Sequence, residues 1–222
     1  VGGMCLGYAA LVLCRTTVGV AGPAMLLDAD LHLDKTAFGA ILGWGTAGNL
    51  MGKLTNGILA DKAGGRRIFL LAIAASAMAI FMFGAMSNTV AFCLFYFLAI
   101  FAKSAGWPSM ANIIKVWFER PKHGRTWGLI ATSSRASSVA ATLLLGSLLL
   151  VVSWRGLFFI SAIIAAIIFI VLIKFLRDSP SDIGELPTES KESVRALTAW
   201  KISHPLNEMA TVGALGFFFR SA

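Results

Sequence analysis

The sequence predicts an all-α membrane protein, a bundle of six transmembrane helices followed by the start of a seventh. Of its 222 residues, 57% are hydrophobic and only 14% are charged, whereas a soluble domain carries about 25% charged residues. Apolar runs of about 20 residues, long enough to cross a bilayer as a helix, recur between short polar loops. These runs are continuous rather than alternating, which favours helices over the strands of a membrane barrel.

The spans are expected at about 3–27, 37–60, 68–88, 90–117, 127–151 and 156–176. Short linkers with breaker residues, such as Gly64, Gly65 and Pro121, separate them. The first run carries Arg15 in its middle and has no basic segment before it. It is therefore predicted to be a transmembrane helix and not a cleavable signal peptide.

Three segments are expected along the chain: a transmembrane bundle at 1–177, a cytoplasmic linker at 178–204 and the truncated start of a seventh helix at 205–222. The linker is rich in charged residues and proline, which is typical of a solvated segment. The last apolar run is too short to span a bilayer. Since the chain also begins with Val1 rather than Met, we expect it to be part of a longer protein.

Basic residues gather in alternate loops. The loops after the second, fourth and sixth spans contain Lys62, Arg66, Arg67, Arg120, Lys122, Arg125, Lys174, Arg177, Lys191, Arg195 and Lys201, whereas the opposite loops contain only Lys35 and Arg155. The basic side, and with it the N-terminus, is predicted to be cytoplasmic. The net charge of +8 therefore reflects membrane orientation, and no nucleic-acid partner is expected. Three tryptophans near span ends are expected to be interfacial anchors: Trp117, Trp127 and Trp154.

Four basic side chains lie inside predicted spans: Arg15 in the first, Lys53 in the second, Lys103 in the fourth and Arg135 in the fifth. A charge at the bilayer centre costs about 3 kcal/mol or more on insertion scales, so such residues are functional candidates. No Asp or Glu falls within the cores of the six spans. Converging cations without a counter-ion predict a cavity for an anion, which Arg binds through its fork and Lys as a point charge. Alternatively, the cations could pair with main-chain carbonyls or with a helix of a missing half.

Polar side chains at helical spacing accompany these cations. The stripes are Thr46, Asn49, Lys53 and Asn56 in the second span, Tyr96, Lys103, Trp107 and Met110 in the fourth, and Thr132, Arg135, Ser138 and Thr142 in the fifth. They predict an aqueous face on each helix or, alternatively, hydrogen bonds between helices. Glycines of the second span predict close helix packing: Gly39, Gly43, Gly48, Gly52 and Gly57.

Residues 57–67, GILADKAGGRR, resemble the loop signature of the major facilitator superfamily. The resemblance implies that the chain is the N-terminal half of a major facilitator fold. It also implies a loop that gates the cytoplasmic side, formed by Gly57, Asp61, Lys62, Gly64, Arg66 and Arg67.

Within that superfamily the chain is similar to the organophosphate:phosphate antiporters, which exchange glycerol phosphate or hexose phosphate for phosphate. The motifs that carry the similarity are Gly106-Trp107-Pro108, Trp117-Phe118-Glu119, Thr132-Ser133-Ser134, Ser153-Trp154-Arg155 and Arg177-Asp178-Ser179-Pro180. The similarity implies that Arg15 and Lys53 grip the phosphoryl group, in a cavity lined by the first, second, fourth and fifth helices. Two positions depart from the family pattern: Ser134 replaces a frequent histidine, and Lys103 replaces a polar uncharged residue.

The expected substrate-binding residues are therefore Arg15, Lys53, Lys103, Arg135, Asn49, Trp107 and Ser134, with Arg220 as an anion contact in the second half. The expected function is exchange of a sugar phosphate or glycerol phosphate for phosphate by alternating access. The expected partners are the lipid bilayer, the anion, and a missing C-terminal half or a second copy.

Two alternatives stay open, a carboxylate symporter of the same superfamily and a sugar-phosphate sensor without transport. A drug:proton antiporter is disfavoured because the six spans offer no membrane-embedded carboxylate. An enzyme is not expected, since no nucleophile–base pair, phosphate-binding glycine loop or metal-ligand cluster is found, and no metal or cofactor is predicted. The histidines, His32, His123 and His204, lie far apart in loops or linkers.

Overall fold

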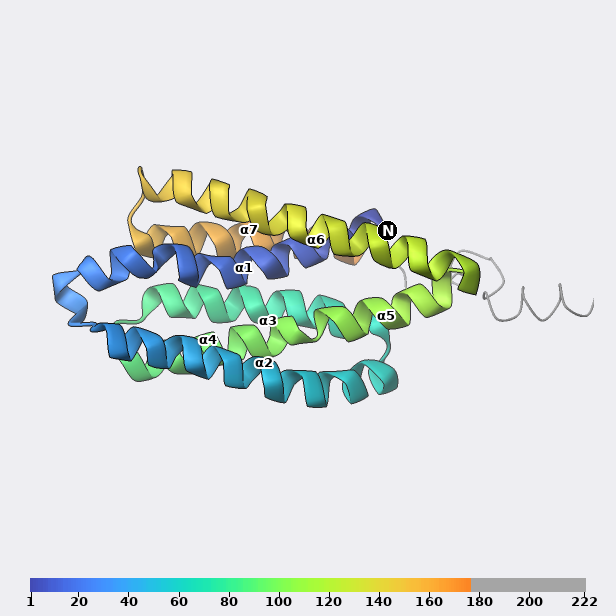
Figure 1. Ribbon diagram of the computed structural model, residues 1–222, viewed down its shortest axis with the longest axis horizontal. Coiled ribbons are helices and arrows are strands. Elements are labelled where there is room, and N and C mark those ends of the chain that lie inside the picture. The colour runs from blue at the N-terminus through green and yellow to red at the C-terminus, as the bar shows by residue number, and fades with distance from the viewer. Residues whose placement is uncertain (177–222) are drawn as a thin grey trace, which may run out of the picture.

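The computed structural model describes residues 1–176 as a bundle of long helices (Figure 1). The helices are α1 Gly2–Leu27, α2 Lys35–Ala63, α3 Gly65–Ala85, α4 Thr89–Ser104, α5 Gly106–Trp117, α6 Arg120–Leu149 and α7 Trp154–Phe175, with a short 3-10 turn, η1 Ala29–Leu31. Because α4 and α5 together form one span, residues 1–176 contain the six predicted spans. The predicted linker at 178–204, the predicted start of a seventh helix at 205–222 and Arg220 lie outside the described residues.

Five of these spans are long and apolar enough to cross a membrane: α1, α3, the combined span Thr89–Trp117, α6 and α7. The second span, α2, has 29 residues, but Gly, Thr, Asn and Lys53 interrupt its aliphatic residues. A helix with one face on a polar cavity tolerates such residues, because that face does not contact lipid. The chain is a multi-pass integral membrane protein.

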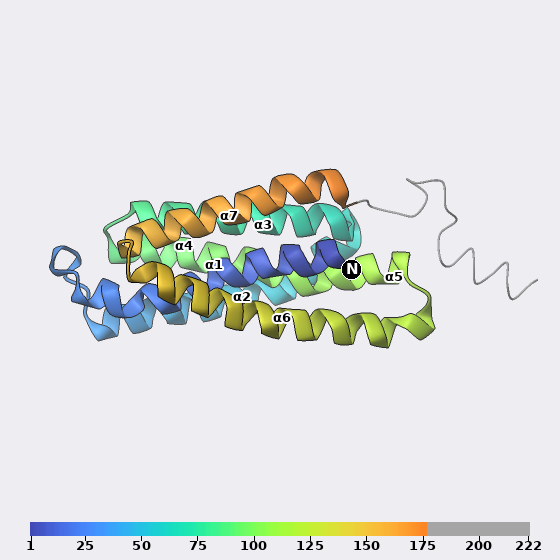
Figure 2. The ribbon, with the colours of Figure 1, turned by 90° about the horizontal axis from the view of Figure 1, so that it is seen from above.

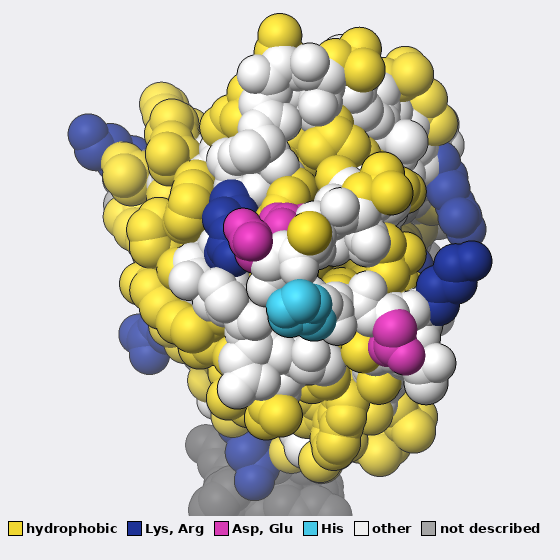
Figure 3. Space-filling model, turned by 90° about the vertical axis from the view of Figure 1, so that its left-hand side faces the viewer, with side chains coloured by type: hydrophobic (Ala, Val, Ile, Leu, Met, Phe, Trp, Pro, Cys, Tyr) yellow, Lys and Arg dark blue, Asp and Glu magenta, His cyan; other side chains and the backbone are white. Residues whose placement is uncertain are grey.

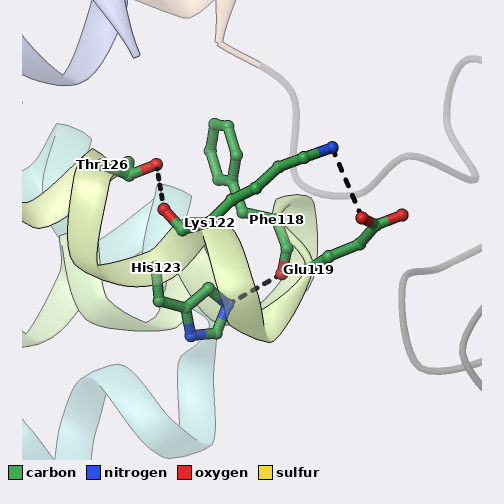
Figure 4. Close-up of polar contacts among 5 residues, drawn as sticks. All are labelled: Phe118, Glu119, Lys122, His123 and Thr126. Carbon is green, nitrogen blue, oxygen red and sulfur yellow. Dashed lines mark hydrogen bonds and ion pairs between the residues drawn. The ribbon is translucent and has the colours of Figure 1, made fainter.

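Several helix ends differ from the prediction. Most clearly, α6 begins at Arg120 instead of at 127, so that Pro121 lies in its first turn. Proline fits there, because its missing N–H would have no partner in the first turn and its φ suits a helix. Figure 4 shows the turn between α5 and α6, where a ring nitrogen of His123 lies 2.8 Å from the main-chain oxygen of Phe118. The Glu119 carboxylate lies 3.4 Å from the Lys122 ammonium. His123 is therefore a half-buried helix residue and not a loop residue.

The helices form two walls that face each other. In one wall α1 packs along α6, and in the other α2 packs along α4. In Figure 1 the first pair lies above the second, and Figure 2 shows α3 and α7 side by side on a further face. The helices α3 and α7 thus complete the bundle without separating the two walls.

Glycine lets α2 approach α4 closely. A Cβ atom on Gly48 would meet the main-chain oxygen of Phe97 at 2.5 Å, and one on Gly52 would meet that of Phe101 at 2.7 Å. At the three other glycines named in the packing prediction a Cβ would meet nothing within 4 Å: Gly39, Gly43 and Gly57. The close contact therefore uses only the glycines on the side of α2 that faces α4.

The fourth span breaks between α4 and α5, which the sequence did not predict. The Ala105 N–H donates to the oxygen of Ala102 at 3.1 Å, instead of to Phe101 as a continued α-helix requires. Pro108 explains the break, because it lacks the N–H that would bond to the Ser104 oxygen, and its ring clashes with that carbonyl. The break lies near the middle of the span Thr89–Trp117.

The Phe101 oxygen that the break releases accepts hydrogen bonds from Asn56 Nδ2 at 2.8 Å and from Ser104 Oγ at 2.7 Å. Asn56 is only 5% exposed. Of the two alternatives for this stripe, Asn56 therefore follows the second: it forms a hydrogen bond between helices, from α2 to α4, and does not face the cavity.

Figure 3 views the end of the bundle where α1 ends and α2 begins. There Trp154, expected to be an interfacial anchor, is 7% exposed, and its Nε1 donates to Asp28 Oδ2 at 2.7 Å. The Arg155 guanidinium lies 4.3 Å from the centroid of the Trp154 ring and donates to the main-chain oxygens of Gly84 and Met86. These contacts tie α1, α3 and α7 together, so Trp154 joins helices instead of facing lipid.

The opposite end of the bundle is the basic one. It collects the C-terminal ends of α2, α5 and α7 and the N-terminal ends of α3 and α6, with Lys62, Arg66, Arg67, Lys115, Arg120, Lys122, Arg125 and Lys174. The cytoplasmic location of this end and of the N-terminus stays a prediction.

Candidate functional site: an open cationic cavity

A cavity of about 820 Å³ opens between the two walls and is lined by residues of α1, α2, α4, α5 and α6. All seven residues expected to bind substrate line it: Arg15, Lys53, Lys103, Arg135, Asn49, Trp107 and Ser134. No residue of α3 or α7 contributes. The structure thus brings together the side chains that the sequence singled out, on the helices that the family resemblance implied.

The four cations divide evenly between the two walls. Arg15 on α1 and Arg135 on α6 belong to one wall, and Lys53 on α2 and Lys103 on α4 belong to the other. All four side chains line the same cavity. The four side chains therefore share one electrostatic field.

These cations have no counter-ion among residues 1–176. No Asp or Glu lines the cavity, and none of the four forms an ion pair or a hydrogen bond with another described residue. Arg15, Lys53 and Arg135 are exposed to the open cavity, and Lys103 is half-buried. Like charges that converge in a medium of low polarity repel one another strongly. An anion in the cavity would relieve this repulsion.

An aromatic cluster holds Trp107 at the cavity wall. Its Nε1 donates to the Tyr8 hydroxyl at 2.7 Å, and its ring stacks on Trp127 with centroids 5.2 Å apart and planes 16° apart. The indole thus has a fixed orientation, set by α1 on one side and by α6 on the other. Sequence reasoning missed Tyr8, although it lies seven residues before Arg15, which places both on one helix face.

The break in the fourth span also lies at the cavity. Ser104 and Pro108, on the two sides of the break, line it together with Lys103 and Trp107. Interrupted helices recur at the binding sites of transporters, where freed main-chain groups and helix ends face the substrate.

Besides Asn56, three residues of the predicted stripes do not line the cavity: Met110, Thr132 and Thr142. Met110 is fully buried in the hydrophobic core. The hydroxyls of Thr132 and Thr142 donate within α6, to the oxygens of Gly128 and Ser138, each at 2.9 Å. Both are exposed, and the α6 residues that line the cavity are Ser134, Arg135 and Ser138.

The predicted gating motif spans the end of α2 and the start of α3. Asp61 Oδ1 accepts a hydrogen bond from Asn112 Nδ2 at 3.0 Å, which joins α2 to α5. Gly57 and Lys62 lie in the last turns of α2, and Arg67 lies exposed in the first turn of α3.

Glycine is required at the turn between these helices. Gly64 has a φ of +89°, which side chains rarely tolerate. At Gly65 a Cβ would meet the main-chain oxygen of Ser109 at 2.6 Å. Arg66 Nη2 donates to the oxygen of Ile173 at 3.0 Å and so ties α3 to α7. The motif therefore links four helices at the basic end.

The described residues contain no group of three or more His, Cys, Asp or Glu side chains that could hold a metal. His32 follows η1 at one end of the bundle, and His123 lies on α6 at the other. His204 lies outside the described residues.

Known proteins resemble the chain along most of its length. It is 28% identical over 188 residues to the probable hexose phosphate transport protein of Chlamydia trachomatis, covering 85% of the chain and 41% of that protein. It is 27% identical over 182 residues to the membrane sensor protein UhpC of Salmonella typhimurium, covering 82% and 41%. It is 25% identical over 193 residues to the glycerol-3-phosphate transporter of Bacillus subtilis, covering 84% and 43%. The chain thus spans about two fifths of the length of these relatives.

A family model described as Major Facilitator Superfamily matches residues 4–222, which is nearly the whole chain. The match agrees with the six-span bundle and with the loop signature at 57–67. The chain belongs to the major facilitator superfamily.

Proposed function

We propose that the chain is the anion-binding half of a secondary transporter that exchanges a sugar phosphate or glycerol phosphate for phosphate. The convergence of four cations in one cavity, without a described counter-ion, carries the proposal. The names of two relatives, a probable hexose phosphate transport protein and a glycerol-3-phosphate transporter, support the same class of substrate.

Each side chain has a role in this proposal. Arg15 offers a planar fork to two phosphoryl oxygens, and Lys53 adds a point charge from the opposite wall. Asn49, Trp107 and Ser134 contribute neutral contacts. Because the two walls contribute different cations, an anion bound between them draws the walls together.

Transport follows by alternating access. Two six-helix bundles enclose one site near the midplane and expose it to each side in turn. The second bundle is the C-terminal half or a second copy of the chain. An empty cationic cavity resists closing because its charges repel, which favours exchange over one-way transport. The motif around Asp61 latches the cytoplasmic side.

A sensor is the second candidate, because two relatives are named membrane sensor protein UhpC. A sensor would bind the sugar phosphate in the same cavity and pass the signal to a partner without moving the anion. Binding and flux must therefore be measured separately.

Binding of glycerol 3-phosphate to the purified full-length protein, followed by titration calorimetry, tests the site. Lys53→Gln should weaken binding about tenfold or more, since a hydrogen bond between charged groups is lost, and should leave the melting temperature unchanged. Lys35→Gln is the matched control, because Lys35 is an exposed lysine at the start of the same helix, outside the cavity. Wild-type affinity in a folded Lys53→Gln variant would overturn the assignment. Binding without exchange in liposomes would favour the sensor.

A further inference from the structure

Trp127 lies behind the wall of the cavity and stacks on a side chain that lines it. The tryptophan was expected to be an interfacial anchor, but it is half-buried and packs against the hydrophobic core. Its ring stacks on that of Trp107, with centroids 5.2 Å apart and planes 16° apart. Trp107 lines the cavity and Trp127 does not. Any effect of Trp127 on a ligand in the cavity therefore passes through another side chain.

Trp107 bridges the two walls of the bundle. It belongs to α5, which continues the span of α4, and its two described ring partners lie on α1 and α6 of the other wall. Its Nε1 donates to the Tyr8 hydroxyl at 2.7 Å, and the Tyr8 ring meets it edge-on with centroids 5.4 Å apart. A single hydrogen bond leaves the indole free to swing about one atom. The face of Trp127 removes this freedom, because a ring that leaves the stack loses the aromatic contact.

The stack also holds a loosely packed part of α6. Residues 131–140 of that helix contain no buried side chain, and they include Ser134, Arg135 and Ser138, which line the cavity. Trp127 precedes Arg135 by eight residues, a spacing that places both on the same face of a helix. The contact that Trp127 makes on this face therefore fixes the rotation of α6 that turns Arg135 toward the cavity.

We propose, on the basis of the function proposed above, that Trp127 is a positioning residue of the anion site. It does not touch the anion. It holds the indole of Trp107 in one orientation and keeps the adjoining face of α6 directed at the cavity. Side chains that are held in place before binding lose less conformational entropy when a ligand binds. The stack thereby raises the affinity of the site without adding a contact to the ligand.

Titration calorimetry of the full-length protein with glycerol 3-phosphate measures this effect. Trp127→Leu keeps an apolar side chain and removes the ring face, so we expect the Kd to rise about three- to tenfold. Trp127→Phe keeps a ring that can stack and should bind with the affinity of the wild type. Trp127→Met, which introduces a flexible apolar side chain without a ring, takes the place of the leucine variant if that variant does not fold.

A double-mutant cycle separates positioning from a general loss of packing. Because Trp127 acts through Trp107, Trp127→Leu should raise the Kd in the wild-type background and leave it unchanged in a Trp107→Ala background. Trp117→Leu is the control, since Trp117 is a half-buried tryptophan at the end of α5 that packs against the hydrophobic core outside the cavity. This control should lower the melting temperature and leave the Kd unchanged.

An unchanged Kd in a folded Trp127→Leu variant would overturn the role of Trp127 and leave the proposed function standing. The same conclusion follows if Trp127→Leu raises the Kd equally in both backgrounds, or if Trp127→Phe or Trp117→Leu raises it as much. Absence of glycerol 3-phosphate binding to a folded wild type would overturn the proposed function itself, and with it the role that rests on it.

Discussion

The side-chain amide of Asn56 donates to the main-chain oxygen of Phe101 at 2.8 Å, which joins α2 to α4 beside the break in the fourth span. The same nitrogen lies 2.8 Å from Ser104 Oγ. Asn56 thereby replaces the main-chain donor that a continuous helix would supply. Asn56 and Ser104 are buried, and Gly52 lets α2 approach the Phe101 oxygen closely at this point. The bond holds the interrupted helix in the shape that presents Lys103 to the cavity.

Loss of this amide should destabilise the bundle. We expect Asn56→Ala to lower the free energy of unfolding by about 1 to 3 kcal/mol, because a buried carbonyl loses a partner. The measurement is the melting temperature of the purified protein in detergent. Asn49→Ala is the control, because Asn49 lines the cavity and its side chain forms no hydrogen bond with another described residue. Equal stability of the two variants would contradict the proposed bond.

Alanine in place of Gly52 should disrupt the contact between α2 and α4. Its Cβ would meet Ser104 Oγ and the Phe101 oxygen, and overpacking of this kind costs about 1 to 3 kcal/mol. Gly57→Ala on the same helix meets nothing within 4 Å and should be neutral or slightly stabilising, since Ala favours helices. Thermal unfolding of both variants distinguishes a steric clash at Gly52 from a general effect of alanine substitution in α2. A Gly52→Ala protein as stable as Gly57→Ala would refute the contact.

The hydrogen bond from Trp107 to Tyr8 should appear as coupling between the two residues. In a double-mutant cycle of Tyr8→Phe and Trp107→Phe, we expect a coupling free energy of about 0.5 to 1.5 kcal/mol in thermal unfolding. Tyr96→Phe is the control, because Tyr96 lines the same cavity and its hydroxyl has no described hydrogen-bond partner. Additive effects for Tyr8 and Trp107 would show that the bond contributes nothing.

Asp28 should make stability depend on pH. The hydrogen bond from Trp154, then the one from the Asp30 N–H, and the nearby charge of Arg155 lower the pKa of the Asp28 carboxyl. Because the pKa of this carboxyl is lower in the folded state than in the unfolded state, its ionised form stabilises the fold at pH values above the unfolded pKa of about 4. This contribution is lost as the pH falls through the folded-state pKa. The melting temperature of the wild type should therefore fall more between pH 6 and about pH 3 than that of Asp28→Asn. Parallel curves would contradict the interaction.

Local signals made most of the fold and the cavity predictable. Charges inside apolar runs are rare and costly, so Arg15, Lys53, Lys103 and Arg135 stood out without any knowledge of packing. Helical spacing then placed Asn49 beside Lys53. The lengths of the apolar runs predicted the spans, although polar residues interrupt the second run.

Features that depend on contacts between helices were predicted less well. Asn56 shares the spacing of the aqueous stripe, yet the release of the Phe101 oxygen draws it into the interface with α4. Pro108 was recognised as part of a motif, but its effect on the helix four residues earlier was not. Trp154 was predicted to be an interfacial anchor from its position near a span end, but its indole donates a hydrogen bond to Asp28. The hydrogen bonds of Asn56 and Trp154 depend on partners more than 40 residues away in sequence. The break in the fourth span depends on a clash of Pro108 within the helix.

The most direct test of the account is counterflow of labelled phosphate into liposomes that contain the full-length protein, with and without Arg15→Ala. Arg15 supplies the bidentate contact to the phosphoryl group in the proposed site. The account predicts uptake that requires phosphate or a phosphate ester inside the liposomes and that disappears in a folded Arg15→Ala variant. Equal uptake by the wild type and the variant, or no uptake by a folded wild type, would contradict it.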